Sequence, residues 1–514
     1  MCIERRGGAN RQATARGAFV RARVVDHRVP QPPGSFIAWI GGLEQLAGET
    51  VDRDPSQCSQ LQIGLVDPED VASSAGLQPL LSIPINLVRG MGRCRSPSTE
   101  RPTQARRPSG NRFDRLSLVV QRPHASTIVN SKGLDSMSSP VSRDLYAALE
   151  RCTYFNQAAL GLIPVPTVDA MHAFVDQTAQ FGNLYLSDDQ EARLLDGVRS
   201  AGAELLGTTT DTVAIVAGAS EGIGQVTWLL EPDRGTVVLV SSDFPSVTYP
   251  WLGSAERRDI ELHFIEDRAE RDLTQDLVEA IDPTTVVVAF SAVQYATGTR
   301  IDTEQVAKRA HEVGARVVVD ATQLAGAAPV AMAEWGVDAL VTSGYKWLSA
   351  HGGVALLALA PDLAGRRPRL VGWKGTSNPF AFDARTLRLA SDARRFELST
   401  MSYASVIGLE SSMAILSSAG FHRIDQHARR LAARLIDRVE ALGWRPFRAL
   451  SDPAASSHIV SLRHAEHESS KIAARLASEH RIICGGRAGG LRVSLHVYND
   501  DGDVDRLVEA LRHV

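Results

Sequence analysis

The chain has 514 residues, of which 44% are hydrophobic and 22% charged, so it can bury a large core and should form more than one domain. Its formal net charge of −4 gives no electrostatic reason to expect nucleic-acid binding, and no apolar run reaches the roughly 18 residues of a membrane span. The five cysteines lack the paired spacing of metal ligands and no secretory signal is evident, so we expect a reducing, cytoplasmic setting and no metal site.

Residues 1–136 are rich in Arg, Pro, Gly and Ser, as in RCRSPSTERPTQARRPSGNR, and show neither helical nor strand periodicity. We expect this extension either to be disordered or to reflect a start assigned too far upstream, since its acidic residues disfavour a targeting peptide. From Met137 a polar start runs into a helical pattern. We interpret residues 137–165 as an N-terminal segment that joins the smaller of two later domains.

Short β-branched runs alternate with helical stretches within residues 166–400, among them TVAIVA, TVVLVS, TTVVVAFS, ARVVVD and DALVTS. Each run precedes a loop rich in Gly, Ser or Thr. This alternation predicts a large α/β domain with a mostly parallel sheet covered by helices on both faces. In such a sheet, ligands bind at the carboxyl ends of the strands.

After residue 400 the strand-like runs thin out, and amphipathic patterns such as HARRLAARLIDRVEALG take over. The strand-like stretches SHIVSLR and GLRVSLHVY and a closing helical pattern follow. We expect residues 401–514 to form a smaller C-terminal α/β domain.

The glycine-rich stretch AIVAGASEGIGQ, residues 214–225, has the glycine spacing with which a backbone approaches a pyrophosphate. An NAD(P)-dependent short-chain oxidoreductase also needs a Tyr followed four residues later by a Lys, and none of the eight tyrosines has one. The oxidoreductase therefore stays as a remote alternative, beside a cofactor-binding protein without turnover.

A set of side chains follows the strand-like runs, at the place where a ligand would bind. They are Ser220, Phe244, Tyr295, Asp320, Gln323, Ser343, Tyr345 and Lys346. Pyridoxal 5'-phosphate needs a lysine for a Schiff base, a carboxylate for its pyridine nitrogen, a flat group on the ring face, and donors for its phosphate. One ligand therefore explains the whole set.

The stretches VVVDATQLAGAAPV and DALVTSGYKWLSAHGG resemble signatures of the class V aminotransferase family, which includes cysteine desulfurases, kynureninase and isopenicillin N epimerase. The resemblance extends through YFNQAALG, SDFPSVTYPW, RFELSTMSYA and LRVSLHVYND, over essentially all of residues 140–514. It implies the fold of fold-type I pyridoxal-phosphate enzymes, with a seven-stranded-type, mostly parallel sheet in the large domain.

The resemblance also implies roles at the ring of the cofactor. Lys346 would form the internal aldimine and later carry the Cα proton of a substrate bound as an external aldimine. Asp320 would pair with the pyridine nitrogen, and Gln323 would hydrogen-bond the ring hydroxyl. Phe244 would stack on the ring where desulfurases have a His, and Tyr295 would either contact the ring hydroxyl or merely pack.

At the phosphate, the resemblance implies donors from the start of a helix, Ala219 and Ser220, and from Ser343 and Tyr345. Thr400 would reach this phosphate from a partner subunit, so the resemblance implies a homodimer. Substrate recognition would fall to Arg492, which would grip the carboxylate of an amino acid, with Asn156 at the mouth of the pocket.

The resemblance implies that the reactions of this family share the external aldimine and the removal of the Cα proton, and that they diverge afterwards. Desulfurases use a nucleophilic Cys on a loop before the substrate arginine, but in IICGGRAGGLRVS the residue Cys484 comes too early, at the end of a strand. We expect it to be a small buried residue. We favour transamination or carbon-sulfur lyase chemistry, with a cysteine desulfurase or selenocysteine lyase, or a racemase resembling isopenicillin N epimerase, as alternatives.

Overall fold

The computed structural model describes residues 139–182 and 186–513, so the predicted extension lies outside the described residues. Its centre is a seven-stranded sheet with the order β2-β8-β7-β6-β5-β3-β4. The strands are β2 (Val213–Val216), β3 (Arg234–Val240), β4 (Asp259–Ile265), β5 (Thr285–Ser291), β6 (Arg316–Asp320), β7 (Ala339–Ser343) and β8 (Ala355–Leu359). Only β8 runs antiparallel to its neighbours in this sheet, which confirms the predicted mostly parallel α/β fold.

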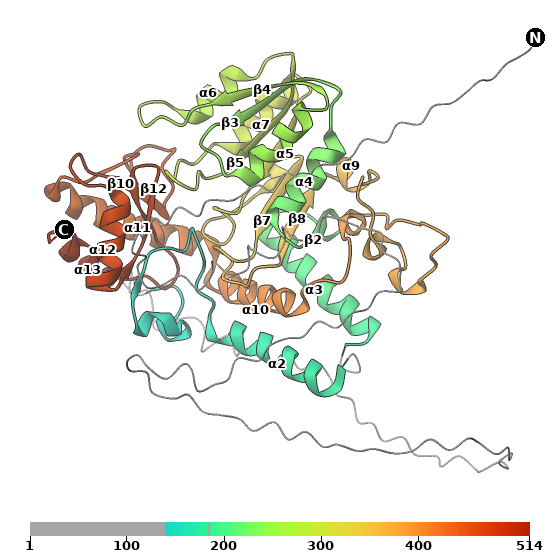
Figure 1. The fold of residues 1–514 in the computed structure, drawn as a ribbon, viewed down its shortest axis with the longest axis horizontal. Helices are drawn as coiled ribbons and strands as arrows, with labels where there is room; N and C mark the ends of the chain where they lie inside the picture. Colours follow the sequence, from blue (N-terminus) through green and yellow to red (C-terminus); the bar gives the residue numbers. More distant parts are fainter. Residues whose placement is uncertain (1–138, 183–185, 514) are drawn as a thin grey trace, which may run out of the picture. The chain divides into compact units, whose positions relative to one another are not determined.

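Both faces of the sheet are buried, which explains why its strands read as continuous hydrophobic runs. In β3, Val237 and Leu239 pack into one hydrophobic cluster, whereas Val238 and Val240 pack into another on the opposite face. Helices α4 (Ala219–Leu230) and α5 (Pro245–Ala255) belong to the first cluster. Helices α3 (Asp188–Leu206), α6 (Leu273–Ala280) and α7 (Thr303–Glu312) belong to the second (Figure 1).

The C-terminal region forms a second, four-stranded antiparallel sheet in the order β12-β13-β10-β9. Its elements are α11 (Phe421–Val439), β9 (Arg445–Pro446), β10 (Ile459–Arg463), α12 (Ser469–His480), β11 (Ile482–Ile483), β12 (Gly485–Arg487), β13 (Gly490–Ser494) and α13 (Asp501–Leu511). The N-terminal strand β1 (Thr153–Tyr154) pairs with β11 in parallel. The N-terminal segment thus contacts the C-terminal region directly.

Helix α10 (Tyr403–Ala419) packs against α2 (Val165–Phe181) and α3, near the bottom of Figure 1. The boundary predicted between residues 400 and 401 therefore stays a prediction. The remaining short elements are α8 (Met332–Trp335), α9 (Pro361–Ala364) and the 3-10 turns Arg143–Leu145, Ala147–Glu150, Thr210–Thr212, Trp373–Gly375, Pro379–Ala381, Ala393–Phe396 and Glu440–Leu442.

Within the described ranges, no single helix is long and apolar enough to cross a membrane. The helices Tyr403–Ala419 and Phe421–Leu442 pass that test of length and composition only as a pair, which is bent by 73°.

Candidate active site

A cavity of about 200 Å³ opens at the carboxyl ends of the parallel strands. It brings together nine residues that the sequence had singled out: Ala219, Ser220, Phe244, Tyr295, Asp320, Gln323, Ser343, Tyr345 and Lys346. The sequence reasoning missed other polar side chains of the lining, namely Ser246, Ser291 and Thr322. The signal for them was available, because each lies within four residues of a predicted site residue.

Lys346 and Asp320 form the charged centre of this cavity, and both are less than 8% exposed. Burial lowers the pKa of Lys346 to about 8, although the carboxylate of Asp320 works in the opposite direction. Burial likewise raises the pKa of Asp320, against hydrogen bonds from Thr322 and the charge of Lys346. With this pKa, roughly a tenth of Lys346 is uncharged at pH 7, and the uncharged amine is the form that attacks a carbonyl carbon.

The main chain of Lys346 is clamped by the N-terminal segment, a contact that the sequence reasoning missed. The side-chain amide of Gln157 donates to the Lys346 carbonyl at 2.9 Å, and the backbone N–H of Gly161 donates to the Tyr345 carbonyl at 2.8 Å. A Cβ atom at Gly161 would lie 2.2 Å from the Lys346 oxygen. Only glycine fits there, so the YFNQAALG stretch holds the lysine in place.

Two aromatic rings form one wall of the cavity. Phe244 and Tyr295 meet edge to face, with ring centroids 5.5 Å apart and an interplanar angle of 84°. The Lys346 Nζ atom lies 5.2 Å from the centre of the Phe244 ring. Phe244 keeps 39% of its surface exposed, which leaves it able to stack on a flat ligand that binds at Lys346.

At one end of the cavity, α4 begins at Ala219 without any side-chain cap at Gly218. The first backbone N–H groups of a helix attract anions, and the helix dipole adds to this attraction. The hydroxyls of Ser220 and Ser246 lie 2.6 Å apart at this end. The arrangement fits a phosphate group held by two hydroxyls and by the start of α4.

Gln323 is held more tightly by protein groups than the sequence suggested. Its Nε2 atom donates to the Ala158 carbonyl at 3.0 Å, and its Oε1 atom accepts from the Trp347 indole at 2.7 Å. One N–H of the amide remains for a ligand. The predicted contact with a ring hydroxyl stays a prediction that depends on this single proton.

Arg492 and Asn156 lie beside the cavity and outside its lining. The Arg492 side chain on β13 is 1% exposed, donates to the Tyr295 carbonyl at 2.7 Å and lies 3.4 Å from the Asn156 Oδ1 atom. Burial lowers its pKa to about 10. No carboxylate among the described residues pairs with it, and its Nε atom has no hydrogen-bond partner there. A buried cation without a protein counter-ion is suited to an anionic ligand.

Two other predicted residues, Thr400 and Cys484, are not among those that line this cavity. Thr400 is exposed and lies outside the lining. Cys484 packs against the hydrophobic core of the C-terminal region, and burial raises the pKa of its thiol to about 12. At neutral pH this cysteine is therefore a thiol and a poor nucleophile.

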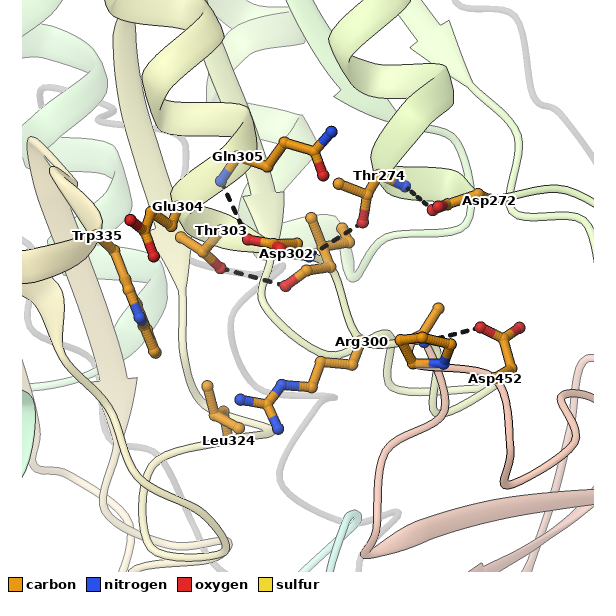
Figure 2. A pocket seen from close by; sticks show the side chains of 13 residues that line it. Asp272, Thr274, Arg300, Asp302, Thr303, Glu304, Gln305, Leu324, Trp335 and Asp452 are labelled. Carbon is orange, nitrogen blue, oxygen red and sulfur yellow. Dashed lines mark hydrogen bonds between the residues drawn. The ribbon is translucent and has the colours of Figure 1, made fainter.

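A second cavity, of about 420 Å³, lies near the starts of α6 and α7 (Figure 2). Several carboxylates line it, but Asp272 and Asp302 already accept hydrogen bonds as caps of these two helices. Asp452 is bonded to the Ala454 N–H. The described part of the chain holds no group of three or more His, Cys, Asp or Glu side chains placed to bind a metal ion.

Comparison with known proteins agrees with the geometry of the first cavity. The family model for aminotransferase class-V matches residues 153–507. An uncharacterized aminotransferase, YcbU, from Bacillus subtilis is 24% identical over 72% of this chain and 96% of its own length. The cysteine desulfurase CsdA from Escherichia coli is 27% identical over 70% of this chain and 92% of its own length.

Solved structures are similar over the same region. A crystal structure of Escherichia coli CsdA has a TM-score of 0.64 and 25% identity, covering 72% of this chain and 96% of that one. A mutant of the protein C-DES, with glycine covalently linked to the PLP cofactor, has a TM-score of 0.65 at 22% identity, which shows the shared fold. It covers 72% of this chain and 98% of that one.

Proposed function

The chain belongs to the aminotransferase class-V family, and from this premise we propose that its cavity at Lys346 acts on an amino acid by transamination or by cleavage of a carbon-sulfur bond. It is a pyridoxal-phosphate-dependent enzyme of the transferase or lyase type. The observation that carries the assignment of the site is the buried pair of Lys346 and Asp320 among nine predicted residues in one cavity.

The residues present fit the cofactor. Lys346 would hold it covalently, Asp320 would accept the proton of its ring nitrogen, and Phe244 would cover one ring face. Ser220, Ser246 and the start of α4 would hold the phosphate. When bound, the cofactor supplies an electron sink that stabilises negative charge at the Cα atom of the substrate.

The protein's own residues would then orient the substrate and move its proton. Arg492 would bind the substrate carboxylate, which gives the buried guanidinium the counter-ion that it lacks. Lys346, with its lowered pKa, would take the proton from Cα once it is released from the cofactor and would return it at the same or another atom.

Cys484 is half-buried, and the raised pKa of its thiol supports a reaction that does not use this residue as a sulfur acceptor. Transamination and carbon-sulfur lyase chemistry therefore stand ahead of a desulfurase with a persulfide at Cys484. The alternatives of a selenocysteine lyase or a racemase resembling isopenicillin N epimerase share the same first steps.

Two further features belong to this proposal. We propose a homodimer in which the exposed Thr400 of one subunit reaches the phosphate bound by the other. We also propose a cytoplasmic location, which would keep Cys484 and Cys152 reduced; both are free thiols within the described chain.

The first test records the visible absorbance of the purified holoenzyme while single amino acids are added without a keto-acid acceptor. Loss of the band until a keto acid restores it indicates transamination. A persistent band with release of ammonia or sulfide indicates a lyase, and inversion at Cα alone indicates a racemase. The Lys346→Ala variant should lose the lysine-dependent band, and a variant that keeps it contradicts the assignment of the site.

A further inference from the structure

Asp243, just after β3, accepts four hydrogen bonds while only 7% exposed. Its Oδ2 atom accepts from the Ser291 backbone N–H at 2.7 Å and from the Gln294 amide at 3.3 Å. Its Oδ1 atom accepts from the Phe244 backbone N–H at 2.7 Å and from the Ser291 hydroxyl. One carboxylate thus joins the end of β3, the end of β5 and the loop that follows β5.

The groups held by Asp243 lead directly to the cavity. Phe244 and Ser291 line it, and Gln294 immediately precedes Tyr295, the second aromatic residue of the wall. Asp243 itself lies behind these residues, outside the lining. It can therefore influence a bound ligand only through the residues that it holds.

A carboxylate is needed at this position because both oxygens face backbone N–H groups, one from Phe244 and one from Ser291. An asparagine would have to point its NH₂ group at one of these two donors. A buried donor that loses its acceptor is costly, so the isosteric amide cannot hold both strand ends. The negative charge of the Asp243 carboxylate also strengthens the hydrogen bonds that it accepts.

Asp243 also controls the hydroxyl proton of Ser291. Ser291 lies opposite Asp320 in the parallel pairing of β5 with β6. Because the single hydroxyl proton goes to Asp243, Asp320 receives no bond from Ser291. The Asp320 Oδ1 atom accepts from the Thr322 N–H at 2.8 Å, and the Thr322 side chain also hydrogen-bonds this carboxylate. Asp320 is therefore held by Thr322 and not by Ser291.

We propose that Asp243 is a positioning residue of the cofactor site: it holds Phe244, Ser291 and Tyr295 in one arrangement and keeps the Ser291 hydroxyl proton away from Asp320, which would pair with the pyridine nitrogen. Burial, with Asp320 adding to it, raises the pKa of Asp243 to about 6, so the group is mostly an ionised acceptor at pH 7.5. The inference rests on the cofactor site proposed above.

The test compares the holoenzyme with the Asp243→Asn variant at pH 7.5. The dissociation constant of pyridoxal 5'-phosphate should rise at least about tenfold, because a bond to a charged acceptor is lost and a donor is left without an acceptor. The visible circular dichroism band of the bound cofactor should weaken, because Phe244 and Tyr295, whose positions depend on the bonds of Asp243, lose their fixed arrangement beside the ring. An unchanged dissociation constant and an unchanged band would overturn the proposal.

Asp338→Asn is the matched control. Asp338 is also a buried carboxylate that bridges strands, and it accepts from the Val317 N–H at 2.8 Å, but it lies just before β7 instead of after a strand. Its variant should lower the melting temperature while leaving cofactor affinity and the circular dichroism band unchanged. If it weakens both cofactor signals as much as Asp243→Asn does, the effect is general destabilisation and the proposal fails.

If Asp243→Asn does not fold, Ser291→Ala takes its place, since it removes only the hydroxyl bond to Asp243. Here the dissociation constant should rise about threefold, the effect of one hydrogen bond, and no rise overturns the proposal. The Lys346→Ala variant distinguishes a failure of this proposal from a failure of the proposed cofactor site. If the visible band is lost in Lys346→Ala but is unchanged in Asp243→Asn, only the role of Asp243 is contradicted. If the band persists in Lys346→Ala, the cofactor site itself is contradicted.

Discussion

At the scale of single residues, the surroundings of Arg492 bear most directly on the charge of the proposed substrate. It combines near-complete burial with bonds to the Tyr295 carbonyl and to Asn156, and the described residues offer it no carboxylate. Such a cation is stable only if a ligand brings the opposite charge or if its own pKa falls, and its pKa does fall, to about 10. This environment supports the proposed role of Arg492 in binding a substrate carboxylate.

We therefore expect Arg492→Lys to lower kcat/KM for an amino-acid substrate about 100-fold, or roughly 3 kcal/mol, because a lysine cannot reproduce bidentate binding of a carboxylate. The visible band of the bound cofactor should be unchanged. Steady-state kinetics and absorbance spectra measure the two effects. Arg487→Lys is the control, since Arg487 is exposed on the neighbouring strand β12, and a loss of similar size there would contradict the assigned role.

At the scale of elements, hydrogen bonds join the segment around Gly161 to the loop between β7 and β8 that carries Lys346. The N-terminal segment is anchored to the C-terminal region by the pairing of β1 with β11. It then crosses to the Lys346 backbone, where Gly161 allows the close approach. Local sequence explains why each element forms, but this contact explains why the Lys346 backbone is held in one position.

Gly161→Ala should destabilise the apoprotein by about 3 kcal/mol, because the added Cβ atom would collide with backbone that cannot move freely. Cofactor binding should weaken as well. Denaturant unfolding and titration with pyridoxal 5'-phosphate test both effects.

The control for Gly161→Ala is Gly224→Ala inside α4, where an added Cβ atom meets nothing within 4 Å. This variant should stabilise the helix by about 1 kcal/mol through helix propensity alone. Equal effects of the two substitutions would show that the approach of Gly161 to Lys346 is not restrictive.

At the scale of the whole molecule, three buried histidines link stability to pH. Burial lowers the pKa of His427 and His458 to about 4 and that of His496 to about 3, with neighbouring positive charges adding to the effect. The His427 Nε2 atom donates to the Asn499 carbonyl at 2.8 Å, so this nitrogen carries the proton of the neutral ring. All three are neutral in the folded protein at pH 7.

The unfolded chain binds these three protons below pH 6.5, while the folded protein does not until pH 4 or lower, so stability is lost as pH falls. Each histidine should remove about 1.4 kcal/mol per pH unit over this interval. Asp243 acts in the opposite direction, because its raised pKa lets the folded state bind a proton first as the pH falls through about 6. Because three histidines oppose one Asp243, a net loss of stability should remain, and it should be steepest between about pH 6 and 5.

Urea unfolding of the apoprotein at pH 7.5, 6.5 and 5.5 tests this expectation. The His427→Gln variant keeps a donor for the Asn499 carbonyl and should lose about one third of the pH dependence. His427 lies outside the cavity lining, so cofactor binding should not follow this change. A pH dependence equal to that of the unaltered chain would show that His427 is not kept neutral by burial.

Much of the site could be predicted from the sequence, since its residues follow β-branched runs at short, regular distances. The carboxyl ends of parallel strands meet at one edge of a sheet, so Phe244, Asp320 and Lys346 had to converge once the runs were taken as neighbouring strands. The family resemblance then supplied the cofactor. The side-chain specificity for a substrate could not be predicted, because residues that contact a substrate side chain follow no regular pattern along the sequence.

The sequence by itself determined the fold class, the cofactor and the residues at the strand ends, because these depend on local periodicity and on spacing along the chain. Only the tertiary structure decided which distant groups hold them in place. Gln157 reaches the Lys346 carbonyl across 189 positions, Arg492 reaches the Tyr295 carbonyl across 197, and Asp243 reaches Ser291 across 48. These bonds arise from the packing of separate elements, whose register and orientation are set by the buried core and leave no local pattern in the sequence.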